Sequence, residues 1–181
     1  MIIEASNAQA VETCMPLSVA LKRDIAWAGG KAANLGEMIN AGIPVPDGFV
    51  VATSAYRAFM IEHDLDEMAR EALTGVDIQD SVELASSTSD IRQRIVSKNI
   101  SPDLASDILQ KYTSLEKGLV AVRSSATAED MDNASFAGQQ DTYLNIEGAV
   151  ELVRGVRGCR ASVIEARAIF YREEQGIDHS E

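Results

Sequence analysis

The sequence predicts an α+β fold in which a small mixed sheet is joined to a larger helical part. Short apolar runs rich in β-branched residues, at residues 49–52, 119–122 and 142–146, have the length and composition of strands. Apolar residues recur at helical spacing through residues 65–115. With 181 residues, 46% hydrophobic and 24% charged, the chain is long enough for one domain of good size or two small ones.

The first forty residues contain a glycine-rich helix start. Residues 1–18 show no clear period, and we expect a poorly ordered lead-in or an edge strand. A helix is predicted to begin at Gly29-Gly30-Lys31 and to stop at Gly42, because the apolar residues between them follow helical spacing. Backbone N–H groups and the Lys31 ammonium at such a start can bind phosphate. Taken alone, however, these residues fit an ordinary turn better. Ala32 stands where a P-loop has Ser or Thr.

The next elements are a strand at residues 49–52 and a helix that follows it. Thr53 or Ser54 is a candidate cap for this helix, because a hydroxyl can accept from the first backbone N–H groups. His63 continues the apolar stripe of the same helix. We therefore interpret His63 as a packed helix residue and not as a ligand.

Residues 64–117 are predicted to form a helical insertion packed beside the sheet. One short helix ends near Gly75, and a second covers residues 82–95 with an interruption at residues 86–89. The third begins at Ser101-Pro102, an N-cap followed by proline in the first turn. Nothing in this region indicates chemistry.

The stretch around which the chain is organised is residues 119–146. Arg123 ends the first strand, and 17 residues dominated by small and polar side chains, 124–140, precede the strand at 142–146. A loop this long in a compact domain is usually a binding loop or disordered. A guanidinium pairs with phosphate through a planar fork of donors, and Gly138 lets backbone N–H groups approach an anion. A hairpin with a polar loop and a surface arginine fits the same residues.

Strong helix formers fill the end of the chain. Two helices are predicted, at residues 149–157 and 159–175, interrupted by Gly155 and Gly158. Most of the arginines here are expected on a solvated face, paired with neighbouring glutamates. They are Arg154, Arg157, Arg160, Arg167 and Arg172.

The net charge of −12 argues against nucleic acid and anionic membranes as partners. A nucleotide site would be a local positive spot, helped by Mg²⁺. Cys14 and Cys159 form no CxxC pair, and His63 and His179 do not cluster with them, so no metal ligand set is expected. The absence of a long apolar run and of a secretion signal predicts a cytoplasmic protein.

Two phrases, VRSSATAED at 122–130 and ASFAGQQDTYLNI at 134–146, resemble the nucleotide-binding domain of the phosphoenolpyruvate synthase family. The rifampicin phosphotransferases carry nearly the same phrase, and the pyruvate phosphate dikinases a more distant one. GGKAANLGEM at 29–38 and the helix at 159–179 also resemble this family, which often has an aromatic residue at the position of Arg160.

The resemblance implies that residues 1–181 are the N-terminal portion of an ATP-grasp nucleotide-binding domain. Lys31 and Arg123 would then hold the phosphates of ATP, with Arg123 acting in catalysis. The loop around Gly138 would close over the polyphosphate and exclude water. Further nucleotide contacts would come from Ser135, Gln139 and Thr142.

The resemblance also implies a longer enzyme, of which this chain is an inactive piece. The missing half of the domain would supply acidic ligands for Mg²⁺, and further domains would carry a phosphorylated histidine and bind pyruvate. The reaction implied for the whole enzyme converts ATP, pyruvate and water into AMP, phosphoenolpyruvate and phosphate. Two alternatives remain open at this point. One is the same portion of a rifampicin-type antibiotic phosphotransferase, and the other is a free-standing nucleotide-binding module without catalysis.

Overall fold

The computed structural model describes residues 13–115, 118–127 and 141–175. Its elements follow the chain as β1 (Cys14–Pro16), η1 (Leu17–Val19), η2 (Lys22–Asp24), α1 (Ile25–Ala28), α2 (Gly30–Asn40), β2 (Phe49–Val51), α3 (Thr53–Glu62), α4 (Leu65–Leu73), α5 (Ser81–Ser97), α6 (Pro102–Ser114), β3 (Val120–Arg123), β4 (Thr142–Ile146), α7 (Ala149–Ala161), η3 (Ser162–Ile164) and α8 (Ala166–Gln175). Mixed helix and short strands agree with the predicted α+β class.

The described strands form two separate antiparallel pairs. β1 pairs with β2, with Met15 opposite Val50, and β3 pairs with β4, with Arg123 opposite Thr142. The prediction of one mixed sheet was therefore wrong for the described residues, which contain no parallel pair. The Gly-Gly-Lys run lies at the start of α2 and not on a strand, so a helix and a strand end carry the two predicted phosphate-binding stretches.

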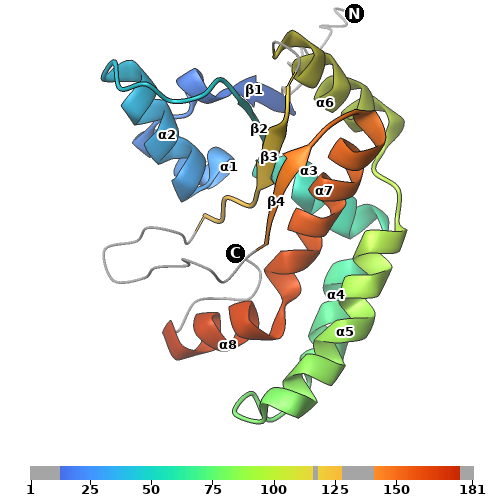
Figure 1. Ribbon diagram of the computed structural model, residues 1–181. Helices are drawn as coiled ribbons and strands as arrows, with labels where there is room; N and C mark the ends of the chain where they lie inside the picture. Colours follow the sequence, from blue (N-terminus) through green and yellow to red (C-terminus); the bar gives the residue numbers. More distant parts are fainter. Residues whose placement is uncertain (1–12, 116–117, 128–140, 176–181) are drawn as a thin grey trace, which may run out of the picture.

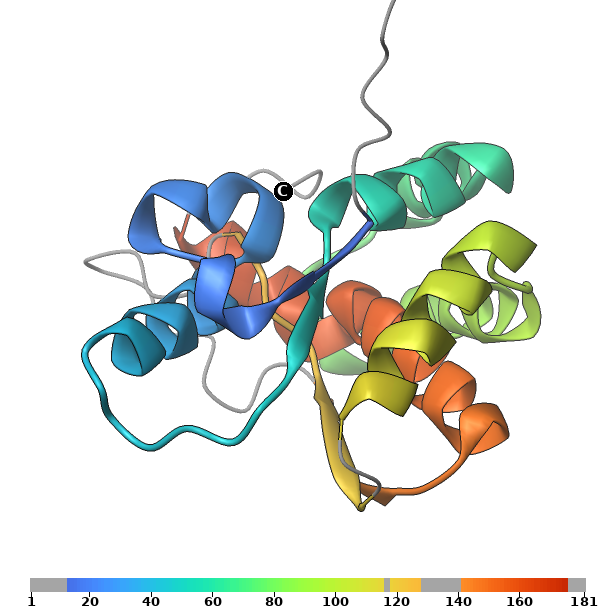
Figure 2. The ribbon, with the colours of Figure 1, turned by 90° about the horizontal axis from the view of Figure 1, so that it is seen from above.

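The β3–β4 pair is central to the arrangement. Figure 1 shows α1 and α2 on one side of it and α7 on the other, and Figure 2 shows the same separation from above. On the α7 side, Val122 and Tyr143 contact the places where Gly155 and Gly158 lack a side chain. A Cβ atom on Gly158 would lie 2.2 Å from the Tyr143 hydroxyl oxygen, so glycine allows this close packing.

These contacts correct the predicted helix boundaries. α7 runs without interruption through Gly155 and Gly158, and the chain instead breaks at η3. The expected interruption at residues 86–89 is also absent, since α5 continues through it. There the Thr88 hydroxyl donates to the Leu84 carbonyl oxygen at 3.0 Å, which satisfies a polar group inside the helix.

Of the two helix N-caps predicted from the sequence, the one on α6 is confirmed and the one on α3 is wrong. Ser101 caps α6 as expected, because its side chain accepts from the Leu104 N–H at 3.4 Å. Thr53 and Ser54 do not cap α3, whose N-cap is Ala52. The Thr53 hydroxyl donates instead to the Ala26 carbonyl oxygen at 2.8 Å, so it ties α3 to α1.

The main core lies where α3, α4, α5, α6 and α7 meet. The strand pairs add Cys14 from β1 and the partly buried Val120 and Val122 from β3. His63 ends α3, with its ring edge-on to Phe59 at 4.9 Å between centroids, which agrees with a packing role. Two arginines contradict the prediction of a solvated face, because Arg160 and Arg172 are buried. Arg154 follows the prediction and pairs with Glu151.

Candidate functional site

The start of α2 is bound to the segment that follows β3. The Gly30 N–H donates to the Ala126 carbonyl oxygen at 2.9 Å, and the Ala32 N–H donates to the Ser125 hydroxyl at 3.0 Å. Gly29 has a φ of 77° and approaches so closely that a Cβ atom there would lie 2.1 Å from the Ser125 carbonyl oxygen. Glycine is required here both for its backbone conformation and for the space it leaves.

This contact changes the role of the helix start. The sequence suggested that N–H groups beside Lys31 can bind phosphate, but the N–H groups of Gly30 and Ala32 are already bonded within the protein. The Lys31 ammonium remains as the cationic group of this turn. One of its three donors contacts the Ser124 carbonyl oxygen at 2.7 Å.

The Lys31 ammonium therefore contacts the residue next to Arg123, although 91 residues separate Lys31 and Arg123 in the sequence. Ser124, which holds the Lys31 ammonium, directly follows Arg123 at the end of β3. The Arg123 side chain is exposed. Two cations next to one turn make a local positive spot on a chain of net charge −12, which suits an anionic group such as a polyphosphate.

Thr142, the described member of the predicted loop contacts, is exposed and pairs with Arg123 across the strands. Because side chains alternate along a strand, Leu144 shares this outer face, while Tyr143 points to α7. A bulge follows at Leu144 and Asn145, where Asn145 adopts a left-handed φ of 56°. Asparagine tolerates this conformation better than most residues, and bulges are frequent beside functional sites.

A buried thiol lies behind the positive spot. The Cys159 Sγ donates to the Asp141 carbonyl oxygen at 3.7 Å, and the backbone of Ser124 lies near the same sulfur. Burial raises the pKa of Cys159 to about 12, and the nearby Asp141 carboxylate adds to the shift while Lys31 opposes it. A thiol that stays protonated is a poor nucleophile and a poor metal ligand, so Cys159 has a packing role.

Three of the predicted contacts, Ser135, Gly138 and Gln139, lie outside the described residues, as does most of the loop at residues 124–140 that was expected to close over the polyphosphate. Sequence reasoning also missed contributors at the site. Ser125 caps α2 from a distant segment, and the Ser124 Oγ is buried without a hydrogen-bond partner among the described residues. The small residues after Arg123 were the available signal, but only the fold shows that they meet α2.

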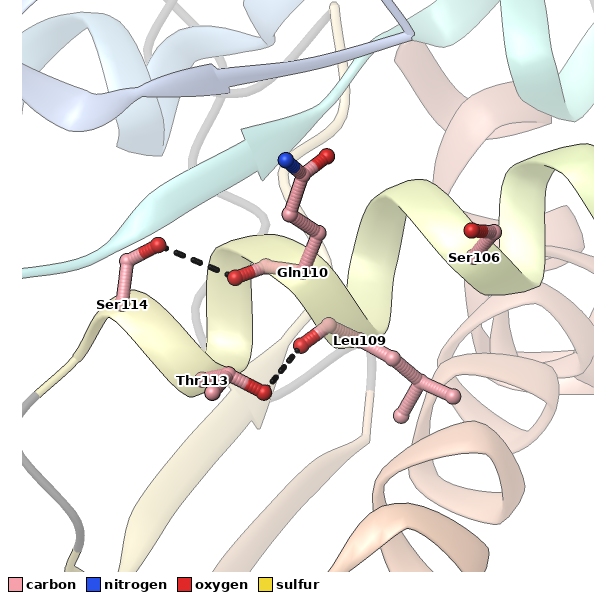
Figure 3. Close-up of a pocket in the computed structure, with 5 residues that line it drawn as sticks. All are labelled: Ser106, Leu109, Gln110, Thr113 and Ser114. Carbon is pink, nitrogen blue, oxygen red and sulfur yellow. Dashed lines mark hydrogen bonds between the residues drawn. The ribbon is translucent and has the colours of Figure 1, made fainter.

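The other features of the described residues give no competing site. They contain no group of three His, Cys, Asp or Glu side chains placed to hold a metal ion. No helix among them is both long enough and apolar enough to cross a bilayer. Figure 3 shows a depression along α6, where the Thr113 and Ser114 hydroxyls donate to carbonyl oxygens one turn earlier in the same helix. These groups are satisfied locally and do not converge on a ligand.

Comparison with known proteins assigns most of the chain to one family. Residues 25–181 match the family described as "Pyruvate phosphate dikinase, AMP/ATP-binding domain". The chain belongs to this family. The match contains both Lys31 and Arg123, so the positive spot lies within a domain whose family description names adenine nucleotides as ligands.

Relatives from archaea and bacteria carry the name phosphoenolpyruvate synthase. A probable phosphoenolpyruvate synthase of Methanothermobacter thermautotrophicus is 48% identical over 165 residues, covering 88% of this chain and 24% of that protein. Another, from Methanocaldococcus jannaschii, is 45% identical and covers 99% of this chain and 16% of the relative. The phosphoenolpyruvate synthase of Pseudomonas aeruginosa is 43% identical, and the match covers 86% of this chain and 21% of that protein. The chain thus spans a quarter or less of these relatives.

Proposed function

We propose that this chain binds ATP as the N-terminal part of the nucleotide-binding domain of a phosphoenolpyruvate synthase. The observation that carries the proposal is the hydrogen bond between the Lys31 ammonium and the carbonyl oxygen of Ser124, the residue that follows Arg123. The membership in an AMP/ATP-binding family and the names of the relatives support the choice of ligand and enzyme. In this proposal the chain is the first subdomain of an ATP-grasp.

The residues present fit a polyphosphate. Arg123 offers a planar fork of donors from an exposed strand end, and Lys31 offers a compact charge from the neighbouring helix start. Thr142 shares the outer face with Arg123, and the loop residues Ser135, Gly138 and Gln139 are proposed to complete the phosphate contacts.

Phosphoryl transfer depends on positioning and charge stabilisation more than on covalent help from the protein. Lys31 and Arg123 would therefore bind the polyphosphate and stabilise the charge that develops on it. The described residues do not fit a magnesium centre, since they lack a cluster of acidic ligands. Following the resemblance to the family, we propose that the Mg²⁺ ligands lie outside this chain.

The whole enzyme is proposed to convert ATP, pyruvate and water into AMP, phosphoenolpyruvate and phosphate. The phosphoryl group would pass through a histidine of another domain, and pyruvate would bind in a further domain. The length of the relatives leaves room for both, because this chain covers 16–24% of the three described above. A cytoplasmic location fits an enzyme that uses ATP and pyruvate.

Calorimetric titration with ATP and Mg²⁺ tests the proposal directly. We expect binding by the 181-residue chain, and its loss in Lys31→Ala. The matched control is Lys98→Ala, which removes an exposed lysine at the end of α5 and should leave affinity unchanged. Absence of ATP binding by the folded wild-type chain would contradict a working nucleotide site in this part of the enzyme.

A further inference from the structure

Asp141, the residue directly before β4, belongs to a network of four alternating charges. The Arg167 Nη2 lies 2.7 Å from the Asp141 Oδ1, and its Nε lies 2.6 Å from the Glu165 Oε2. The Arg92 Nη2 lies 2.6 Å from the Glu165 Oε1 and 4.0 Å from the Asp141 Oδ2. Each carboxylate therefore lies between the same two guanidinium groups, a network that constrains geometry more than an isolated exposed pair does.

The members of this network come from separate parts of the fold. Arg92 belongs to α5, in the region predicted as a helical insertion. Glu165 and Arg167 lie at the start of α8, which packs against α5. Asp141 thus links the strand pair of the candidate site to two helices that carry no predicted nucleotide contact.

The backbone of Asp141 is also held, from the side of the candidate site. Its carbonyl oxygen accepts from Cys159, whose sulfur lies near the backbone of Ser124. The Ser124 carbonyl oxygen in turn accepts from the Lys31 ammonium. An unbroken series of contacts therefore connects the network around Asp141 to Lys31.

A second connection runs along the strands. Asp141 is followed by Thr142, and Thr142 pairs with Arg123. A displacement of Asp141 would therefore shift both proposed phosphate-binding cations. It would reach Lys31 through Cys159 and Ser124. It would reach Arg123 through Thr142. Displacement of a binding group by even an ångström weakens a site that depends on several groups meeting one ligand.

We propose that Asp141 is a positioning residue for the nucleotide site, held by Arg92 and Arg167 so that Lys31 and Arg123 meet one polyphosphate. This inference rests on the proposed function. The helical insertion then has a function in nucleotide binding, because Arg92 of α5 contributes to the geometry of the site without contacting the nucleotide.

The test compares nucleotide affinity with folding stability. Asp141→Asn removes the charge at nearly constant size, and Asp141→Glu restores it. Calorimetry with ATP and Mg²⁺, and with inorganic tripolyphosphate, is performed below the unfolding transition of each variant. We expect both dissociation constants to rise about tenfold in Asp141→Asn and to recover at least partly in Asp141→Glu. The matched control, Glu67→Gln, breaks the exposed Arg70–Glu67 pair and should leave both affinities unchanged.

The outcomes separate the two proposals. If the wild-type chain binds ATP and folded Asp141→Asn binds equally well, the positioning role is wrong while the nucleotide site stands. Failure of the wild-type chain to bind ATP overturns the proposed function and this inference together. If Asp141→Asn does not fold, Arg167→Lys replaces it, because a single ammonium cannot form the same two-atom contact with Asp141 and Glu165. Unchanged affinity in Arg167→Lys would then overturn the inference.

Discussion

The Nζ atom of Lys31 donates a 2.7 Å hydrogen bond to the carbonyl oxygen of Ser124, the residue that directly follows Arg123. Lys31 therefore has two roles. This hydrogen bond holds α2 to the end of β3, and the ammonium is also proposed to bind phosphate. Lys31→Met keeps most of the aliphatic stem and removes both. We expect ATP binding to be lost and the free energy of unfolding to fall by about 1 kcal/mol, since a partly buried carbonyl loses its donor. Denaturant titration alongside calorimetry measures the two effects, and an unchanged stability would contradict the structural role.

Arg123 provides the contrasting case, because its side chain is exposed. Arg123→Ala should change the free energy of unfolding by no more than about 0.5 kcal/mol. In the full-length enzyme the same change should lower ATP-dependent turnover by about 100-fold or more, the scale of losing a charged transition-state contact. The turnover of Arg123→Lys should lie between that of the wild type and that of Arg123→Ala, since an ammonium keeps the charge but lacks the planar fork of donors. Turnover within a few-fold of wild type would remove Arg123 from the site.

The close approach of Gly29 to Ser125 predicts a large cost for any side chain at this position. Gly29→Ala adds a Cβ atom 2.1 Å from a backbone carbonyl oxygen at a φ of 77°, so we expect about 3 kcal/mol of destabilisation. Gly42→Ala is the matched control, because Gly42 has a φ of 75° and open space around it. There the cost should be about 1 kcal/mol, from the backbone conformation alone. Equal costs in urea denaturation would show that the contact with Ser125 is not formed.

The sequence predicted those features of the fold that depend on neighbouring residues. It did not predict those that depend on contacts between distant elements. Local signals worked, since the strand at 142–146 and the cap at Ser101 follow from neighbouring residues. Gly155 and Gly158 misled the helix prediction, because the reasons for a glycine there lie on other elements: Val122 of β3 faces Gly155, and the ring of Tyr143 of β4 faces Gly158. A glycine in a helix and a glycine that ends a helix look alike until the packing partner is known.

The same limit applies to the candidate site. Lys31 and Arg123 could be selected for their chemistry, but their meeting through Ser124 is a tertiary contact. Asp141 was not selected, because an aspartate before a strand has no distinctive pattern without Arg92 and Arg167 beside it. The roles assigned to Ser135, Gly138 and Gln139 stay predictions, since these residues lie outside the described part of the chain.

The buried thiol of Cys159 predicts a loss of stability in alkali. Its pKa is about 12 in the folded chain, against an ordinary value of 9.0, because burial disfavours the thiolate. The unfolded chain therefore releases this proton first, and the associated stability, fully present below pH 9, is lost as the pH rises towards 12. Cys159→Ser keeps a donor for the Asp141 carbonyl oxygen and does not titrate there. We expect a shallower decline of the free energy of unfolding between pH 9 and 11, with Cys14 still contributing because burial raises its pKa to about 11. Equal slopes for both proteins would contradict the burial of the Cys159 thiol.

The buried position of Arg160 predicts that its charge can be removed from the core without a loss of folding stability. Its guanidinium lies 4.7 Å from the centre of the Phe59 ring and donates to the Ala55 carbonyl oxygen at 3.4 Å, while its Nη1 has no hydrogen-bond partner among the described residues. Burial lowers the pKa of Arg160 to about 10, because desolvation disfavours the charged form.

Arg160→Met keeps the aliphatic packing and removes the buried charge. The free energy of unfolding should stay the same or rise by about 1–3 kcal/mol, as happens when buried ionic groups are replaced by apolar side chains of similar size. Arg154→Met is the control, since that side chain is exposed and its pair with Glu151 contributes little. A loss of several kcal/mol in Arg160→Met would contradict this expectation and show that the contacts with Phe59 and Ala55 more than compensate for burying the charge.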